Sequence, residues 1–369
     1  MRILIVNNNF SSEFGGKAGG AERYVLDVVE GLKSKGHKVY TSTGTEHLEK
    51  AEVVFVNNCF NTTLLKEITQ KPAVRFVHDH QVYCPGTPKY WFHSQKQCCI
   101  NTSWRCLYYA LCEQCLSRNP ARAVPAVLAK PKELAVNRKF KKILVASEFM
   151  RQMLLENGFA KEQVEINHLF PYGEFVSNLR GQENLPNDKP LILYAGRIFK
   201  EKGVDQLIRA VALLKQDFRL VICGAGWDKE RCARIVKELG LDSRVTFAGS
   251  VPQKELLEYY QQAEVVVVPS VWPEPFGLIG IEAYQYGKPV VGFDSGGISE
   301  WLKNGKNGFL VEGLNISQMA QKIDLLLKDK DLAQKMGQAG KAMVAEEFTF
   351  KGHIKRLEEV FETVINENN

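Results

Sequence analysis

Two glutamates in the stretch PSVWPEPFGLIGIEAYQYG place carboxylates in an otherwise apolar part of the chain. Glu274 stands between two prolines, and Glu282 follows eight positions later inside an apolar run. Ionised carboxylates only accept hydrogen bonds, which suits sugar hydroxyls. Because eight residues make about 2.2 helical turns, helical periodicity alone does not put both at one height on one face. We therefore expect them to bind different parts of one elongated ligand. The alternatives are a helix N-terminal charge for Glu274 and a surface position for Glu282.

Arg197 and Lys202 form a second candidate pair, in the stretch GRIFKEKGVDQLI that directly follows the apolar run LILYAG. Arginine offers a planar fork for bidentate contacts and lysine a mobile point charge, so the two together suit a diphosphate. A solvated charged turn is the alternative interpretation. We favour the diphosphate because the pair follows a predicted strand directly and would lie opposite a glycine-rich loop of the first half.

That loop contains glycines at 15, 16, 19 and 20, ahead of a helix expected to begin near Ala21. Without side chains, such a loop lets backbone N–H groups approach an anion at the helix N-terminus. A flexible connector is the alternative. The spacing is not GxGxxG, which disfavours a dinucleotide site.

Apolar runs predict the elements that would position these residues. Strands are predicted at 2–7, 38–43, 52–57, 73–78 and 142–147 in the first half, and at 191–196, 219–224, 244–249, 265–270 and 289–294 in the second. Continuous apolar strands separated by helices are typical of parallel sheets covered on both faces. The predicted fold class is α/β with two doubly wound, Rossmann-like domains, which bind ligands at the carboxyl ends of their strands.

Composition predicts where the domains begin and end. We expect an N-terminal domain over 1–180, interrupted by an insertion at about 79–142 that is rich in cysteine and aromatic residues and then basic. A second domain is expected over 181–348, because the polar stretch 181–190 carries two prolines and lacks periodicity. The last segment, 349–369, has a one-sided apolar stripe and is expected to pack back on the N-terminal domain as a helix.

Bulk properties exclude several classes of protein. A net charge of +6 over 369 residues is too weak to indicate nucleic-acid binding. No apolar run approaches the roughly 18 residues of a membrane span. The N-terminus MRILIVNNNF is too short in apolar residues for a signal peptide, so a cytoplasmic location is expected. Nine cysteines in that compartment indicate thiols or metal ligands rather than disulfides.

The order and spacing of these motifs resemble the retaining glycosyltransferases of family 4, which have the GT-B fold. The resemblance rests on GGAE near the N-terminus, GR…KG at the start of the second half, and PS…PEPFGL…E followed by GKPVV and GGISEWLKNGKNGFLV. It covers nearly the whole chain. Each motif is weak to moderate alone, and the combination is specific.

The resemblance implies roles for individual residues. Glu282 would hold the ribose hydroxyls and Glu274 those of the transferred sugar. Arg197 and Lys202 would bind the diphosphate and stabilise the charge that builds there as the glycosidic bond breaks. The remaining donor contacts would come from backbone N–H groups near Phe276, Gly277 and Leu278, and from Gly19 and Gly20 of the first domain.

A histidine at the end of the fourth strand often contacts the transferred sugar in this family. The stretch VRFVHDHQVYC offers His78 as the better match and His80 as the second. A structural histidine is the alternative for either.

The reaction implied is transfer of a sugar, with retention of configuration, from a UDP- or GDP-sugar to a glycan or lipid-linked acceptor, as in cell-surface polysaccharide assembly. Attack from the front face would need no protein nucleophile, cofactor or catalytic metal. Two alternatives stay open: a nucleotide-sugar epimerase or hydrolase on the same fold, and a non-catalytic nucleotide-sugar-binding protein.

The sequence departs from the family in two places. Many relatives carry NGVD near the end of the first domain, where this chain has LFPYGEF at 169–175. The segment after His80 also carries six cysteines, and a structural zinc site is a hypothesis for four of them: Cys84, Cys98, Cys112 and Cys115. Thiols without a metal are the alternative.

Basic residues dominate the end of the insertion, with eight Lys or Arg and one Glu over 118–142. Mixed with Val, Leu and Ala, they could lie on an anionic membrane surface as a peripheral contact. Pro120, Pro125 and Pro131 are expected to break a continuous helix there, which weakens this interpretation. A solvated basic face is the alternative.

Overall fold

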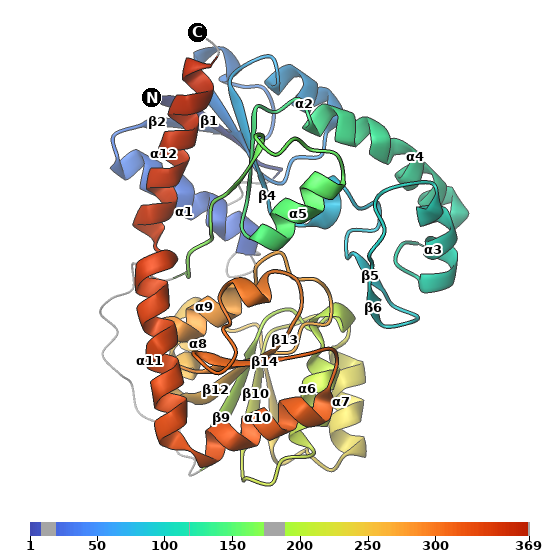
Figure 1. Ribbon diagram of the computed structural model, residues 1–369, viewed down its shortest axis with the longest axis vertical. Helices are drawn as coiled ribbons and strands as arrows, with labels where there is room; N and C mark the ends of the chain where they lie inside the picture. The colour runs from blue at the N-terminus through green and yellow to red at the C-terminus, as the bar shows by residue number, and fades with distance from the viewer. Residues whose placement is uncertain (9–19, 118, 173–188, 368–369) are drawn as a thin grey trace. The chain divides into compact units, whose positions relative to one another are not determined.

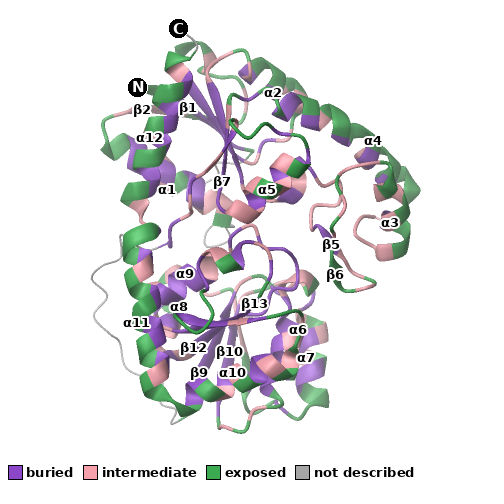
Figure 2. Ribbon diagram, in the orientation of Figure 1, coloured by how far each residue is buried: buried purple, intermediate pink, exposed green. Residues whose placement is uncertain are grey.

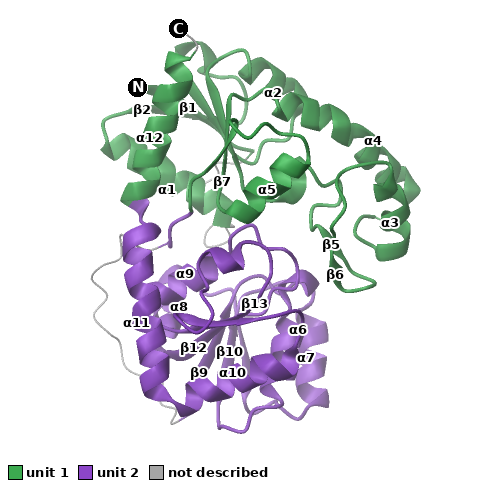
Figure 3. Cartoon of the chain, viewed as in Figure 1, with its two compact units in different colours: residues 1–168, 351–369 green, residues 169–350 purple. Residues whose placement is uncertain are grey.

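The computed structural model of the protein describes residues 1–8, 20–117, 119–172 and 189–367. The chain divides into two compact units (Figure 3). Unit 1 comprises Met1–His168 and Lys351–Asn369, and unit 2 comprises Leu169–Phe350. The expected join at 181–190 falls mostly outside the described residues. No helix in the described ranges is long and apolar enough to cross a membrane.

Unit 1 is built on a six-stranded parallel sheet (Figure 1). The strand order is β2-β1-β3-β4-β7-β8, with bounds β1 Arg2–Val6, β2 Lys38–Ser42, β3 Val53–Val56, β4 Ala73–Val77, β7 Lys142–Val145 and β8 Val164–Ile166. All four residues of β3, Val-Val-Phe-Val, are buried, as expected for a strand covered on both faces. The covering helices include α1 (Gly20–Ser34), α2 (Thr62–Ile68) and α5 (Glu148–Glu156).

The C-terminal helix α12 (Phe350–Asn366) belongs almost entirely to unit 1. Its predicted apolar stripe is buried, at Ile354, Leu357, Val360, Phe361 and Val364. The ring of Phe361 lies 5.4 Å from that of Phe55 in β3, and His353 Nε2 lies 2.9 Å from the hydroxyl of Tyr24 in α1. This helix therefore completes the core of unit 1 from the far end of the sequence.

Unit 2 repeats the same architecture with strand order β11-β10-β9-β12-β13-β14. The strands are β9 Leu191–Ala195, β10 Arg219–Cys223, β11 Val245–Gly249, β12 Ala263–Val268, β13 Val290–Phe293 and β14 Gly308–Val311. The helices are α6 Val204–Val211, α7 Lys229–Glu238, α8 Gln253–Gln262, α9 Leu278–Gln285, α10 Ile316–Lys328 and α11 Lys330–Glu347. The prediction of two doubly wound α/β domains is confirmed.

The insertion of unit 1 holds the short antiparallel pair β5 (Tyr90–Trp91) and β6 (Lys96–Gln97) and the helices α3 (Arg105–Glu113) and α4 (Pro120–Asn137). The expectation that prolines break this region is wrong, because α4 runs through Pro125 and Pro131.

Several contacts explain the uninterrupted helix. Pro120 occupies the first helical position, where its missing N–H is not needed, and Asn119 caps the helix by accepting from Ala121 N at 2.9 Å. The internal prolines each remove one backbone hydrogen bond. The buried face of α4, which includes Val127 and Leu134, packs against neighbouring elements such as α2 and offsets that loss.

Candidate active site

The carboxyl ends of two adjacent strands of unit 2 position the charged candidates. β9 and β12 pair in parallel, so the loops that follow them leave the same edge of the sheet. The carbonyl of Glu201, in the 3₁₀ turn Lys200–Lys202 after β9, accepts from Val271 N at 3.0 Å in the loop after β12. Gly203 has φ 66°, and a Cβ there would lie 1.9 Å from the Pro269 carbonyl oxygen. Glycine therefore permits the two loops to approach.

Lys202 and Glu274 form a buried ion pair within this edge. Lys202 Nζ lies 2.7 Å from Glu274 Oε1, and Ser270 Oγ donates to the same oxygen at 2.5 Å. Glu274 is only 6% exposed. Burial alone would raise its pKa, but the Lys202 ammonium and the hydrogen bonds from Lys202 and Ser270 outweigh burial and hold the pKa below the ordinary value. Glu274 is therefore an ionised acceptor at neutral pH.

The loop after β13 fixes the backbone of Glu274. Gly297 N donates to Glu274 O at 2.6 Å, and Gly296 forms an isolated parallel bridge with Glu274. Gly296 has φ 62°, and a Cβ there would lie 2.3 Å from the Glu274 carbonyl oxygen. The Pro-Glu-Pro segment, which follows β12 in the chain, is thus held by the loop that follows β13.

Glu282 lies in α9, just over one turn from its start. It is 8% exposed, which contradicts the alternative of a surface position. Its Oε2 accepts a hydrogen bond from the Tyr260 hydroxyl at 2.8 Å. Burial and the neighbouring Glu282 carboxylate raise the pKa of Tyr260 well above its usual range, so this hydroxyl keeps its proton and acts as the donor.

Between the two glutamates, the buried side chain of Phe276 is followed directly by the start of α9. The ring of Phe276 packs 5.6 Å from that of Phe348, and the carbonyl of Phe276 accepts from Trp301 Nε1 at 2.6 Å. Gly277 adopts φ 87° as the N-cap, and α9 begins at Leu278. The first N–H groups of a helix have no intrahelical acceptor, so an anion or a hydroxyl can receive them.

Arg197 is exposed after β9, with its guanidinium carbon 5.0 Å from the ring centre of Phe199. No carboxylate of the described ranges pairs with it. Unlike Lys202, it therefore presents a charge without an ion-pair partner in the described part of unit 2.

In unit 1, His78 follows β4 and is half-buried. Its Nε2 lies 2.9 Å from Asn57 Oδ1, and its ring packs 4.6 Å from Phe76 and 4.8 Å from Tyr24. Burial, and then the positive fields of His353 and Arg75, lower its pKa to about 3, so it is neutral at pH 7.

The other unit 1 candidates are less informative. His80 is fully buried, and its Nδ1 lies 2.5 Å from the Tyr83 hydroxyl, which makes it part of the core. Gly20 is the first residue of α1, and Gly19 lies outside the described residues.

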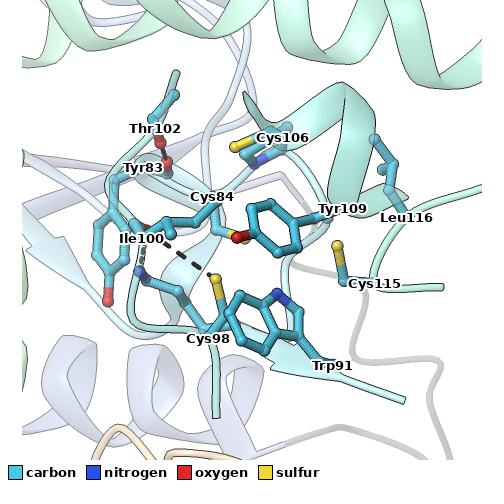
Figure 4. Close-up of a pocket in the computed structure, with 13 residues that line it drawn as sticks. Tyr83, Cys84, Trp91, Cys98, Ile100, Thr102, Cys106, Tyr109, Cys115 and Leu116 are labelled. Atoms are coloured by element: carbon cyan, nitrogen blue, oxygen red, sulfur yellow. Dashed lines mark hydrogen bonds between the residues drawn. The ribbon is translucent and has the colours of Figure 1, made fainter. Parts of the chain in front are cut away.

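The cysteines of the insertion line a pocket, but not in the predicted set (Figure 4). Three of the four predicted zinc ligands line it, together with Cys106, whereas Cys112 is exposed and lies elsewhere. Across the described residues, no group of three His, Cys, Asp or Glu side chains could hold a metal ion. The described residues therefore do not form the predicted zinc site.

Comparisons with known proteins give a family match that lies within unit 2. Residues 176–343 match the family described as Glycosyl transferases group 1. An uncharacterized glycosyltransferase of Methanocaldococcus jannaschii is 32% identical over 211 residues, which cover 54% of each chain. A D-inositol 3-phosphate glycosyltransferase of Nocardia farcinica is 36% identical over 168 residues, 43% of this chain and 37% of the relative. The chain thus spans about half the length or less of these curated relatives.

Solved structures match over a greater length. Sucrose-phosphate synthase from Thermosynechococcus elongatus aligns with a TM-score of 0.74 at 20% identity, covering 99% of both chains. Anabaena HepE, solved in complex with UDP-glucose, aligns with a TM-score of 0.68 at 19% identity, covering 98% of this chain and all of that one. At these identities the likeness shows the fold alone.

Proposed function

Because residues 176–343 match the group 1 glycosyltransferases and the chain has the GT-B fold, we propose that it transfers a sugar from a nucleotide-diphosphate sugar to a glycan or lipid-linked acceptor, with retention of anomeric configuration. One observation carries the proposal: an ionised carboxylate and a lysine are held together, nearly dry, at the carboxyl edge of the unit 2 sheet. That edge is where ligands bind in doubly wound folds.

Each residue has a role that its surroundings support. Glu282, fixed by Tyr260, accepts hydrogen bonds from the ribose hydroxyls. Glu274 accepts from hydroxyls of the transferred sugar, and the backbone at Phe276, Gly277 and Leu278 donates to phosphate or sugar oxygens. Since Glu274 is ionised and its pKa is lowered, it has no proton to give at neutral pH and serves in binding.

The two cations act on the leaving group. As the bond between the anomeric carbon and the β-phosphate oxygen breaks, its electron pair passes to that oxygen, and Lys202 and Arg197 stabilise the resulting charge. The acceptor oxygen bonds to the anomeric carbon from the same face, and its proton passes to the departing phosphate. Arginine and lysine here take the part that a divalent cation plays in other phosphate sites.

The test begins by identifying the donor. A thermal-shift screen of UDP-, GDP- and ADP-sugars at about 100 times the Kd should reveal it, because such binding stabilises by roughly 2.7 kcal/mol. Donor turnover is then measured for Lys202→Ala and Glu274→Ala, each expected to fall about 10²–10³-fold. Lys200→Ala is the matched control, since Lys200 is an exposed lysine of the same turn and should keep wild-type turnover.

Product analysis separates the alternatives. Transfer to an added acceptor supports the proposal. Formation of an epimerised nucleotide sugar, or of free sugar that acceptors never divert, would indicate an epimerase or a hydrolase. Donor binding with no turnover under any condition would indicate a binding protein. Wild-type turnover in Lys202→Ala or Glu274→Ala would refute the roles assigned here.

A further inference from the structure

The insertion of unit 1 exposes a large share of the bulky apolar side chains found on the described surface. Among the ten large hydrophobic residues recorded as exposed, five lie in or next to α3 and α4: Trp104, Tyr108, Leu111, Val124 and Leu128. Trp104 is 77% exposed and Leu128 69%. Exposed apolar side chains that gather on two helices in contact with each other indicate an interaction site, whereas scattered single residues do not.

Helical spacing places these side chains on the outer faces of two helices. Trp104, the N-cap of α3, is followed at intervals of four and three by Tyr108 and Leu111, so the three share one face. On α4, Val124 and Leu128 are four apart and likewise share a face. The two helices contact each other, and both show exposed residues on their outer sides (Figure 2).

The charge around these apolar residues has one sign. Arg105, Arg122, Lys132 and Lys139 are exposed, and none of them forms an ion pair among the described residues. The two acidic residues of the region are less exposed than these basic residues, and both have partners. Glu133 pairs with the buried Lys130, and Glu113 accepts a hydrogen bond from Ser94 N at 3.0 Å. The surface is therefore apolar and basic, without an exposed acid on either helix.

We propose that this α3–α4 surface docks unit 1 onto an anionic lipid bilayer, with Trp104, Tyr108 and Leu128 inserted at the interface and the basic side chains against the lipid phosphates. Aromatic rings with a polar tip suit the boundary between headgroups and acyl chains, and long basic side chains extend from it to the headgroups. Anionic lipid attracts such charges. A second copy of the chain fits less well, because a two-fold interface would set the basic surface against itself.

The proposal reaches beyond the basic segment alone, because α3 supplies most of the aromatic surface and no exposed acid. Its link to a lipid-linked acceptor rests on the proposed function: docking would hold unit 1 at the leaflet in which such an acceptor resides. The docking itself does not depend on that function, so the two can be tested separately.

Vesicle flotation of the full chain, without donor or acceptor, tests the docking. Binding is expected to phosphatidylcholine vesicles containing about a quarter phosphatidylglycerol, to weaken as salt rises, and to be far weaker with phosphatidylcholine alone. Trp104→Ala should weaken binding about tenfold, and Trp104→Phe should retain most of it, since the aromatic area is kept. Lys132→Ala and Lys139→Ala should each weaken it about fivefold.

Matched controls lie in unit 2. Trp227 is 61% exposed, and Lys306 is exposed, so Trp227→Ala and Lys306→Ala make equivalent changes away from the proposed surface and should leave flotation unchanged. Circular dichroism and donor turnover in the absence of vesicles verify that the Trp104 and lysine variants fold and work.

Three results would overturn the proposal. These are equal flotation with neutral vesicles, wild-type flotation of Trp104→Ala, and concentration-dependent self-association that Trp104→Ala abolishes while vesicle binding is absent. The last would show that the surface binds a second copy. Loss of donor turnover in Lys202→Ala with flotation intact would separate the catalytic proposal from this one.

Discussion

Ionisable side chains at the strand ends of the two units differ in charge state: Glu274 of unit 2 is charged, whereas His78 of unit 1 is neutral. In unit 2, Glu274 is buried and ionised, because the Lys202 ammonium and the hydrogen bonds to the carboxylate outweigh the effect of burial on its pKa. In unit 1, His78 lies among aromatic rings near His353, and burial holds it neutral. Two parallel sheets that differ in strand order therefore present different chemistry at the carboxyl ends of their strands.

This difference shows what each environment is suited to do. Under the proposed function, an incoming diphosphate would take the place of Glu274 as the partner of Lys202. A neutral imidazole exchanges hydrogen bonds with hydroxyl groups and adds no net charge. Fold topology places the side chains, and the neighbours of each one decide its charge.

The largest effect is expected from breaking the backbone support of the paired site. Gly296→Ala would force a non-glycine residue into φ 62° and bring its Cβ within 2.3 Å of the Glu274 carbonyl oxygen. We expect destabilisation of about 3 kcal/mol or more and loss of most donor turnover, measured by thermal unfolding and by the turnover assay. Gly305→Ala is the control: φ is 77° there, but no atom lies within 4 Å, so only about 1–2 kcal/mol of backbone strain is expected. Equal effects of the two substitutions would show that the Gly296 contact does not support the site.

A smaller effect is expected in the pH dependence of stability, which the neutral histidines of unit 1 should cause. Folding lowers the pKa of His78 to about 3 and that of His353 to about 4, whereas an unfolded histidine titrates near 6.5. The unfolded chain therefore binds more protons below pH 6.5. The stability that comes from keeping these rings neutral is present above that pH and is lost as the pH falls toward the folded pKa values, about 4 for His353 and about 3 for His78.

Urea unfolding at pH 7 and pH 5 measures this loss, which we expect to be about 1–2 kcal/mol for each ring. His353→Gln should reduce the dependence on pH by about half, whatever its effect on stability at pH 7. His93→Gln, at an exposed position, should leave the dependence unchanged. The explanation fails if His353→Gln keeps the full dependence.

Most of the fold could be predicted because long apolar strands carry a strong signal. β8 and β14 were missed, since Val164–Ile166 and Gly308–Val311 are short edge strands that resemble loops in sequence. The effect of the prolines of α4 was predicted wrongly. Each proline weakens the helix only locally, whereas the packing that offsets this loss comes from elements distant in sequence.

The site could be predicted residue by residue but not as a network. Lys202 and Glu274 were each identified from their motifs, yet their pairing across 72 positions depends on the adjacency of β9 and β12. Ser270 and Tyr260 escaped prediction, because a serine at a strand end and a tyrosine in an amphipathic helix are ordinary residues at ordinary places. Only the folded chain shows that each donates a hydrogen bond to a glutamate.

The smallest effect concerns Glu282. Its hydrogen-bond donor is the neutral Tyr260 hydroxyl, whereas Glu274 pairs with the Lys202 ammonium. Tyr260→Phe removes the hydroxyl 2.8 Å from Glu282 Oε2 and leaves that buried oxygen without this donor, at a cost of about 1–3 kcal/mol. Because we assign Glu282 to the ribose, remote from the bond that breaks, the donor KM should rise about tenfold while kcat changes little. Tyr259→Phe, at the neighbouring position of α8, is the control and should leave both constants unchanged. A fall in kcat with KM unchanged would instead place Glu282 near the reacting carbon and remove the distinction between the two glutamates.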